Sequence, residues 1–432
     1  MAGVAGFGVV AAESIKLGEN YQQATAQIAA SSGQTIQSAQ AVANQFLKTG
    51  FASTFSAQEI ATAYGGVAGQ LKATEGHALS AGDAMTVMQS SMDLAEASGQ
   101  SLGGTTQALA ATMQAYGLKT KDASKAADQL YNISVLTNQP ILGLAQVLDR
   151  LKGRLGALAP SLSDVGTLMA FPSVAAQGSR GAMVVNTALT TLLGGSKNVS
   201  KELKSLGVSI FNSSGKFIGM RGVIAQLEPK LKGMSDQQRM LAEKTLFGSS
   251  AAQLMGTIIR GGVAGYDKAA AAVNRLGSAH DAAEKQSNTL HGQTEKLKAG
   301  LEDLGVRLGE FLIPKLEKLG EIVSKTVGWF EKHKAAAIAL AAIVGGALTV
   351  AFGAWAASLF MTGGALAPLI GPLGLIVVAV AAIGVAVYEL YNNWSTVWDG
   401  IKSVALAVWN DGLKPVFDAI KNTVATVVGW VK

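Results

Sequence analysis

Apolar residues recur at three- and four-residue steps through most of the chain, which is the period of amphipathic α-helices. Helix starts are marked at Ser56-x-x-Glu59 and Ser235-x-x-Gln238, where the hydroxyl and the fourth side chain can satisfy each other's free backbone N–H groups. The pattern therefore predicts a mainly α fold. It divides the chain into an N-terminal segment (1–30), a helical repeat region (31–195), a helical region with a small β-hairpin (196–264), a long amphipathic helix (265–334), an apolar helical hairpin (335–391) and an amphipathic C-terminal helix (392–432).

The first third of the chain contains an internal repeat, in which residues 31–51 align with residues 97–118 after one insertion. Each copy consists of a polar turn, an amphipathic helix and a glycine stop. The matching pairs include Gly33/Gly99, Gln34/Gln100, Ile36/Leu102, Phe46/Met113 and Gly50/Gly117. Repeated helical units usually build stacked or elongated assemblies instead of an enzyme pocket.

One short segment departs from the helical period. Between Gly207 and Gly219, two runs of β-branched and aromatic residues flank the turn sequence Asn-Ser-Ser-Gly. This pattern predicts a small β-hairpin near residues 208–218.

The long helix expected from residue 265 carries a heptad stripe that Pro314 interrupts and that resumes in a shifted phase. Asp303/Arg307 is spaced as an outward-facing charge pair. The stripe predicts a coiled coil between copies of the chain, and packing of one amphipathic helix within its own chain explains it equally well. Its members are Leu297, Leu301, Leu304, Leu308, Phe311, Leu316, Leu319, Val323 and Phe330.

The stretch from Ala335 to Tyr388 has no charged residue, and it is long enough for two membrane-spanning helices of ~20 residues each. Gly363, Gly364, Pro368 and Pro372 mark an uncharged turn between them. We predict a hairpin that can insert into a membrane; the alternative is a hairpin buried inside a protein shell. The predicted inserting residues are Ala335, Leu340, Ile343, Ala347, Phe352, Trp355, Phe360, Leu366, Ile370, Leu375, Val378, Ile383 and Tyr388.

The apolar stripe continues after the hairpin to the last residue with no glycine behind it, which suggests that the 432 residues are a fragment of a longer chain. Tyr391, Trp394 and Trp398 lie where the second span would meet water. Aromatic residues at this depth are typical of interfacial anchors, although ordinary core packing explains them equally well.

Composition removes most enzymatic chemistry. The chain has no Cys and only four His, which excludes disulfide scaffolds, thiolate metal sites and cysteine nucleophiles. His280 and His291 would lie about 16 Å apart on one helix, too far apart to hold one ion. Ser213–Lys216 lacks the remaining residues of a phosphate-binding loop and is expected to be a turn. We therefore predict no enzymatic activity, no metal and no cofactor.

The net charge of +6 comes from one block. Residues 197–334 contain 21 Lys and Arg against 14 Asp and Glu. Such a block could contact anionic lipid headgroups or nucleic acid, whereas the interspersed acidic residues favour an ordinary solvated helical surface.

Several segments in their order resemble bacteriophage tail tape-measure proteins: SSGQTIQSAQ, SMDLAEASGQSLGGTTQALAATMQAYGL, AADQLYNISVLTN, GSRGAMVVNTALTTLL, LGVSIFNSSGKF and EKTLFG, followed by the apolar hairpin. The resemblance covers about residues 20–335. It implies an elongated helical protein, made in the host cytoplasm, that lies in the lumen of the tail, sets tail length and scaffolds the tube.

The resemblance also implies partners. These are other copies of the chain, with a trimer favoured, together with the tail-tube protein, tail-tip proteins and tail assembly chaperones. At infection such proteins leave the tail, insert their hydrophobic part into the host inner membrane and help the phage DNA to enter, so their relation to DNA is indirect. The alternative from another class is a colicin-like pore-forming toxin, in which a helical shell hides an apolar hairpin.

Overall fold

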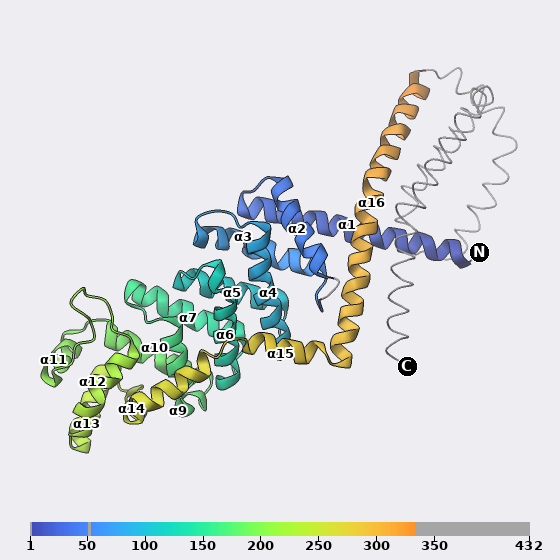
Figure 1. The fold of residues 1–432 in the computed structure, drawn as a ribbon. Helices are drawn as coiled ribbons and strands as arrows, with labels where there is room; N and C mark the ends of the chain where they lie inside the picture. Colours follow the sequence, from blue (N-terminus) through green and yellow to red (C-terminus); the bar gives the residue numbers. More distant parts are fainter. Residues whose placement is uncertain (1, 51–52, 333–432) are drawn as a thin grey trace. The chain divides into compact units, whose positions relative to one another are not determined.

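The structure is a computed structural model that describes residues 2–50 and 53–332. These residues form helices joined by short connections (Figure 1). The helices of the first half are α1 (Ala2–Ser32), α2 (Ile36–Gly50), α3 (Ala57–Glu75), α4 (Ala81–Ser98), α5 (Leu102–Tyr116), the 3-10 turn η1 (Thr120–Asp122), α6 (Ala123–Thr137), α7 (Ile141–Leu155) and the 3-10 turn η2 (Gly156–Leu158). Those of the second half are α8 (Leu162–Met169), α9 (Pro172–Ala175), α10 (Ser179–Leu193), α11 (Lys197–Leu206), α12 (Met220–Lys232), α13 (Asp236–Phe247), α14 (Ala252–Val273), α15 (Ser278–Ser287) and α16 (Leu290–Lys332). The predicted mainly α fold is confirmed.

The chain forms two compact units. The larger unit, residues 19–303, is a stack in which helices pack on the second-next helix along the chain. One row contains α2, α4, α6 and α8, and the other contains α3, α5, α7 and α10. The smaller unit combines residues 1–18 with residues from 304 onward. The domain boundaries predicted at residues 30, 195 and 264 stay predictions.

Local sequence signals explain where many helices begin and end. Both predicted capping boxes are formed: Ser56 and Glu59 start α3, and Ser235 and Gln238 start α13. Each box satisfies two backbone N–H groups that the first turn of a helix leaves free. At the other end, α4 stops at Gly99, whose φ of 65° is left-handed and therefore suits glycine.

The internal repeat corresponds to repeated local structure. The chain turns after α1 at Gly33 and after α4 at Gly99, with φ values of 67° and 65°. The next residue makes the same backbone hydrogen bond in both copies, from Gln34 to Ala29 at 3.1 Å and from Gln100 to Ala95 at 3.2 Å. The two copies therefore use the same helix–turn–helix geometry.

The core of the larger unit is aliphatic with a few large aromatic side chains. Phe46 and Tyr64 are fully buried and meet edge to face, with ring centroids 5.5 Å apart. Phe46 and its repeat equivalent Met113 are both buried, so the repeat places its largest apolar residues in the core. Burying such side chains contributes about 1.5–3 kcal/mol each.

The predicted β-hairpin near residues 208–218 is wrong. The segment has one isolated antiparallel bridge, between Phe211 and Phe217, and no strand forms in the described part of the chain. The Asn212 side chain accepts hydrogen bonds from the backbone N–H groups of Ser214 and Lys216, which makes the segment a tight turn. In the first arm, the side chain of Gln226 in α12 binds the backbone N–H and the carbonyl of Ser209, at 3.0 and 2.9 Å, so these groups are taken by a side chain instead of a second strand.

The single long helix predicted over residues 265–334 is also wrong. α14 ends at Val273, and α15 and α16 follow as separate helices. The first break contains Gly277, whose φ of 75° is not helical. The carboxylate of Asp128 accepts hydrogen bonds from the backbone N–H groups of Gly277 and Ala279, so contacts from a distant helix stabilise the break.

Candidate functional site

The first part of the predicted self-association stripe is a solvent-exposed apolar face of α16. Leu297 and Leu301 are 47% and 57% exposed. Leu290, which lies one heptad before Leu297, is 85% exposed and extends the stripe toward the start of the helix. Three exposed leucines on one line of one helix are unusual, because large apolar side chains are normally buried unless they meet a partner.

The rest of the stripe is less exposed or lies outside the described side chains. Leu304, Leu308 and Phe311 are half-buried. Leu316, Leu319, Val323 and Phe330 belong to α16, but their side chains are not among those the structure describes. The prediction that the stripe joins copies of the chain therefore stays a prediction.

The opposite face of α16 packs within the chain. Ala299 and Asp303 are buried there. The Asp303 carboxylate accepts a hydrogen bond of 2.7 Å from the backbone N–H of Ala57, the first residue of α3. The expectation that Asp303 faces outward with Arg307 is wrong, because Asp303 places its negative charge at the positive end of another helix.

In the smaller unit, α1 and α16 approach each other at glycines. A Cβ atom on Gly309 would lie 2.1 Å from the carbonyl oxygen of Ser14, and one on Gly18 would lie 2.9 Å from the Gly309 backbone. Gly305 is covered by the Leu17 side chain. Gly305 and Gly309 are four residues apart and therefore lie on one face of α16, where they allow the two backbones to touch.

Other carboxylates cap helices that are distant in the sequence. Asp128 caps α15 through Gly277 and Ala279, at 2.8 and 3.0 Å. Asp164 accepts a 3.1 Å hydrogen bond from the backbone N–H of Met220, at the start of α12, and a 2.6 Å hydrogen bond from the Tyr266 hydroxyl. Local sequence patterns do not reveal these contacts, because a remote cap leaves no signal beside the helix that it caps.

Glu75 makes a similar contact at the end of α3. Its carboxylate accepts hydrogen bonds from the backbone N–H and the hydroxyl of Thr120, the first residue of η1. Burial favours the neutral carboxyl, but the two hydrogen bonds from Thr120 and the charge of Lys119 outweigh it, so the pKa of Glu75 is lowered. Asp128, Asp164 and Glu75 thus stabilise the helix stack through contacts between helices that are distant in the sequence.

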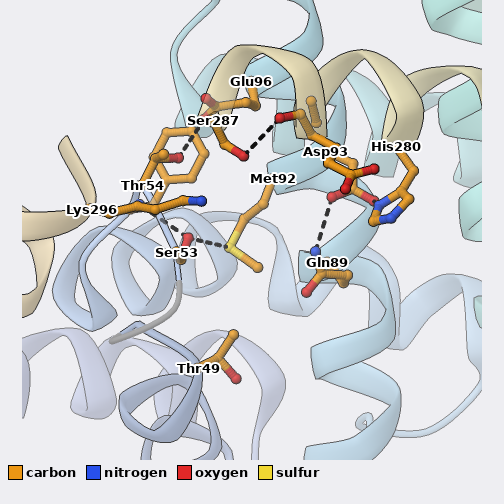
Figure 2. A pocket seen from close by; sticks show the side chains of 13 residues that line it. Thr49, Ser53, Thr54, Gln89, Met92, Asp93, Glu96, His280, Ser287 and Lys296 are labelled. Atoms are coloured by element: carbon orange, nitrogen blue, oxygen red, sulfur yellow. Dashed lines mark hydrogen bonds and ion pairs between the residues drawn. The ribbon is translucent and has the colours of Figure 1, made fainter. Parts of the chain in front are cut away.

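A polar pocket of about 300 Å³ lies in the larger unit, between α4, α15, the start of α16 and the segment before α3. Asp93 accepts a 2.9 Å hydrogen bond from Gln89 and lies 3.1 Å from the ring nitrogen of His280, and Glu96 accepts a hydrogen bond from Thr54 (Figure 2). The two carboxylates are therefore occupied by contacts within the chain.

The histidines do not form a metal site in the described part of the chain. His280 lies in α15 and His291 in α16, so the prediction that both lie on one helix is wrong. No group of three or more metal-ligating side chains is found among the residues described by the structure. Ser213–Lys216 forms the turn expected of it.

The predicted membrane residues, from Ala335 to Tyr388, and the predicted anchors Tyr391, Trp394 and Trp398 lie outside the described residues. Within residues 2–50 and 53–332, none of the helices has the length and apolar character needed to cross a membrane.

The chain is similar in sequence to phage tail proteins. The family model of phage-related minor tail proteins matches residues 51–248. The tape measure protein of Pneumococcus phage Dp-1 is 25% identical over 322 residues, which cover 74% of this chain and 27% of that protein. The chain thus spans about a quarter of the length of this curated relative. No solved structure matches. The resemblance to tape-measure proteins is confirmed.

Proposed function

We propose that this chain acts within the lumen of a phage tail, where it sets tail length and scaffolds polymerisation of the tail tube. The main support for this proposal is the similarity to a tape measure protein over 74% of the chain. The match to minor tail proteins over residues 51–248 supports the same assignment to the virion tail.

Copies of the chain associate through the leucine stripe of α16 in this proposal. The exposed leucines Leu290, Leu297 and Leu301 repeat at heptad spacing, and the opposite side of the helix is occupied by contacts within the chain. A small parallel homo-oligomer, with a trimer favoured, would bury all three leucines at once. Another copy is the natural occupant because the same stripe is then present on every partner.

The proposed partners of this oligomer are the tail-tube protein around it, tail-tip proteins at one end and tail assembly chaperones before the tube closes. At infection the chain leaves the tail and its charge-free stretch enters the host inner membrane, which aids DNA entry. The support for the membrane step is the 54-residue run from 335 to 388, which contains no charged residue.

The membrane step is tested with the full chain and anionic liposomes that contain a dye. Ala347→Asp together with Ile383→Asp places two charges in the apolar run, and each charge near a bilayer centre costs about 2.5–3.5 kcal/mol or more. We expect the double variant to lose dye release and to keep tail assembly. Equal release by the variant and the original chain would overturn the membrane step.

The ruler function is tested by tail length. Duplicating residues 305–332 adds 28 residues, which extend a continuous helix by about 42 Å at 1.5 Å per residue. We expect tails that are longer by about that amount in electron micrographs. A matched phage carries the same 28 residues in the turn between Ser213 and Ser214, where they would form a side loop, and its tails should keep their length. Unchanged length in the first phage would contradict the proposal.

A further inference from the structure

The positive charge of the larger unit is confined to three neighbouring helices. From Lys197 to Phe247, over α11, α12 and α13, the chain has nine Lys and Arg against four Asp and Glu. From Glu19 to Leu193 it has nine against ten. The three helices lie together at one end of the stack (Figure 1). This end of the unit is therefore a basic pole.

The lysines of α11 form one line on its outer surface. Lys197, Lys201 and Lys204 are spaced by four and three residues, so they lie within about 60° of one another around the helix. All three are exposed, whereas Val199 and Leu203 are buried on the opposite side. No ion pair found in the described part of the chain uses these lysines, so their charge is available to a ligand.

An apolar groove of about 440 Å³ runs beside this line, between the end of α10, α11 and the segment after α11. Lys204 is the charged residue that lines it. The apolar side chains of the groove include Leu192, Val199, Leu203, Val208 and Ile210. Lys204 thus lies at the edge of an aliphatic groove, and Lys201 lies three residues before it on the exposed surface of α11.

We propose that α11 and this groove bind an anionic phospholipid, with the headgroup phosphate at Lys201 and Lys204 and part of an acyl chain in the groove. The ligand must be amphipathic, because the lysines attract an anion and the groove is aliphatic. Nucleic acid fits the lysines but has no aliphatic chain to place in the groove. The site contains no residue of the charge-free stretch at 335–388, and the proposal does not depend on the proposed function.

The test uses the full chain and dihexanoylphosphatidylglycerol below its micelle concentration, so that insertion of the charge-free stretch into a bilayer cannot contribute. Binding is measured by isothermal titration calorimetry. The comparison ligands are dihexanoylphosphatidylcholine, inorganic phosphate and a 20-base-pair duplex DNA. Circular dichroism checks that each variant is folded.

Three variants separate the parts of the site. Lys201→Glu with Lys204→Glu removes the anion contacts, and Ser200→Trp fills the groove from an exposed position that lines it. Lys230→Glu with Lys232→Glu on α12 makes the same change of net charge away from the groove and is the control. One lysine attracts an anionic lipid surface by about 1 kcal/mol, which is about fivefold in affinity.

We expect the anionic lipid to bind at least tenfold more tightly than the zwitterionic one or phosphate. Lys201→Glu with Lys204→Glu should weaken binding by about 25-fold or more, because each substitution removes an attraction and adds a repulsion. Ser200→Trp should weaken binding by tenfold or more, and the control should stay within about twofold. Equal losses in the control would show a diffuse charge effect and overturn the site. Absence of lipid binding, or DNA binding that is lost in the Lys201/Lys204 variant but not in Ser200→Trp, would also overturn it.

Discussion

The contact between Asp128 and α15 gives a quantitative prediction. Asp128 is 3% exposed, and its two oxygens accept hydrogen bonds from the backbone N–H groups of Gly277 and Ala279. Hydrogen bonds to a charged group contribute about 1.5–3 kcal/mol each, and a buried N–H left without an acceptor adds its desolvation cost. We therefore expect Asp128→Ala to lower the free energy of unfolding by about 3–5 kcal/mol.

Asp128→Asn is the sharper variant because it keeps the shape of the side chain. One oxygen still accepts, but the amide NH₂ now faces the second N–H, so we expect a loss of about 2–3 kcal/mol. Asp149→Asn on the exposed side of α7 is the matched control and should change stability by less than about 0.5 kcal/mol.

Urea unfolding followed by circular dichroism measures the stability of both variants. Hydrogen exchange at the amides of residues 277–279 reports the same contact locally and should become faster in both Asp128 variants. An Asp128→Asn protein as stable as the Asp149 control, with unchanged exchange at these amides, would show that the remote carboxylate does not stabilise the stack.

The remaining predictions concern buried tyrosines and the α1–α16 crossing. The Tyr64 hydroxyl is buried without a hydrogen-bond partner, so Tyr64→Phe should leave the free energy of unfolding in urea unchanged or raise it. Tyr266→Phe loses a hydrogen bond to the carboxylate of Asp164 and should lower the free energy of unfolding by about 1.5–3 kcal/mol. Equal effects of the two substitutions would contradict this prediction. Burial raises the pKa of Tyr64, Tyr116 and Tyr266. The unfolded chain therefore releases these protons at a lower pH than the folded chain, so the free energy of unfolding should fall as pH rises above about 10. A free energy of unfolding that stays constant in urea titrations from pH 9 to 11 would contradict this prediction. Gly309→Leu should separate α1 from α16 and cost about 1–3 kcal/mol, seen as faster hydrogen exchange in residues 2–18, and unchanged exchange would show that the crossing tolerates a side chain.

Features that depend on residues close together in the chain could be predicted from the sequence alone. The capping boxes at Ser56 and Ser235, the turn at residues 213–216 and the glycine stop at Gly117 all follow from local hydrogen bonding or backbone conformation. The mainly α fold followed from the apolar period for the same reason.

The errors occurred where distant residues decide the structure. The 265–334 stretch has a continuous helical pattern, but it breaks before α15, where Asp128 supplies the cap from about 150 residues away. Asp303 looked like half of a surface pair, yet it caps α3 from 246 residues away. In the 208–218 segment, the side chain of Gln226, 17 residues after Ser209, binds both backbone polar groups of Ser209. No local pattern contains this information.

The candidate site could be predicted from the sequence only in part. The heptad spacing located the leucine stripe on α16, but spacing alone could not decide which face of the helix is covered by its own chain. Burial of Asp303 and Ala299 settles that question for the described part of the helix. The groove beside α11 was not predicted, because its lining comes from α10, α11 and the segment after α11 together.

Disulfide cross-linking tests our proposal that copies of the chain associate through the leucine stripe of α16 inside the tail. The chain has no cysteine, so Leu301→Cys introduces a single thiol on the stripe. Glu295→Cys places one about 120° away around the same helix, at a side chain that is 36% exposed. Assembled tails carrying each variant are oxidised and examined by non-reducing gel electrophoresis. We expect disulfide-linked chains for Leu301→Cys and few for Glu295→Cys. Equal cross-linking of both variants, or none at Leu301→Cys, would contradict the proposal.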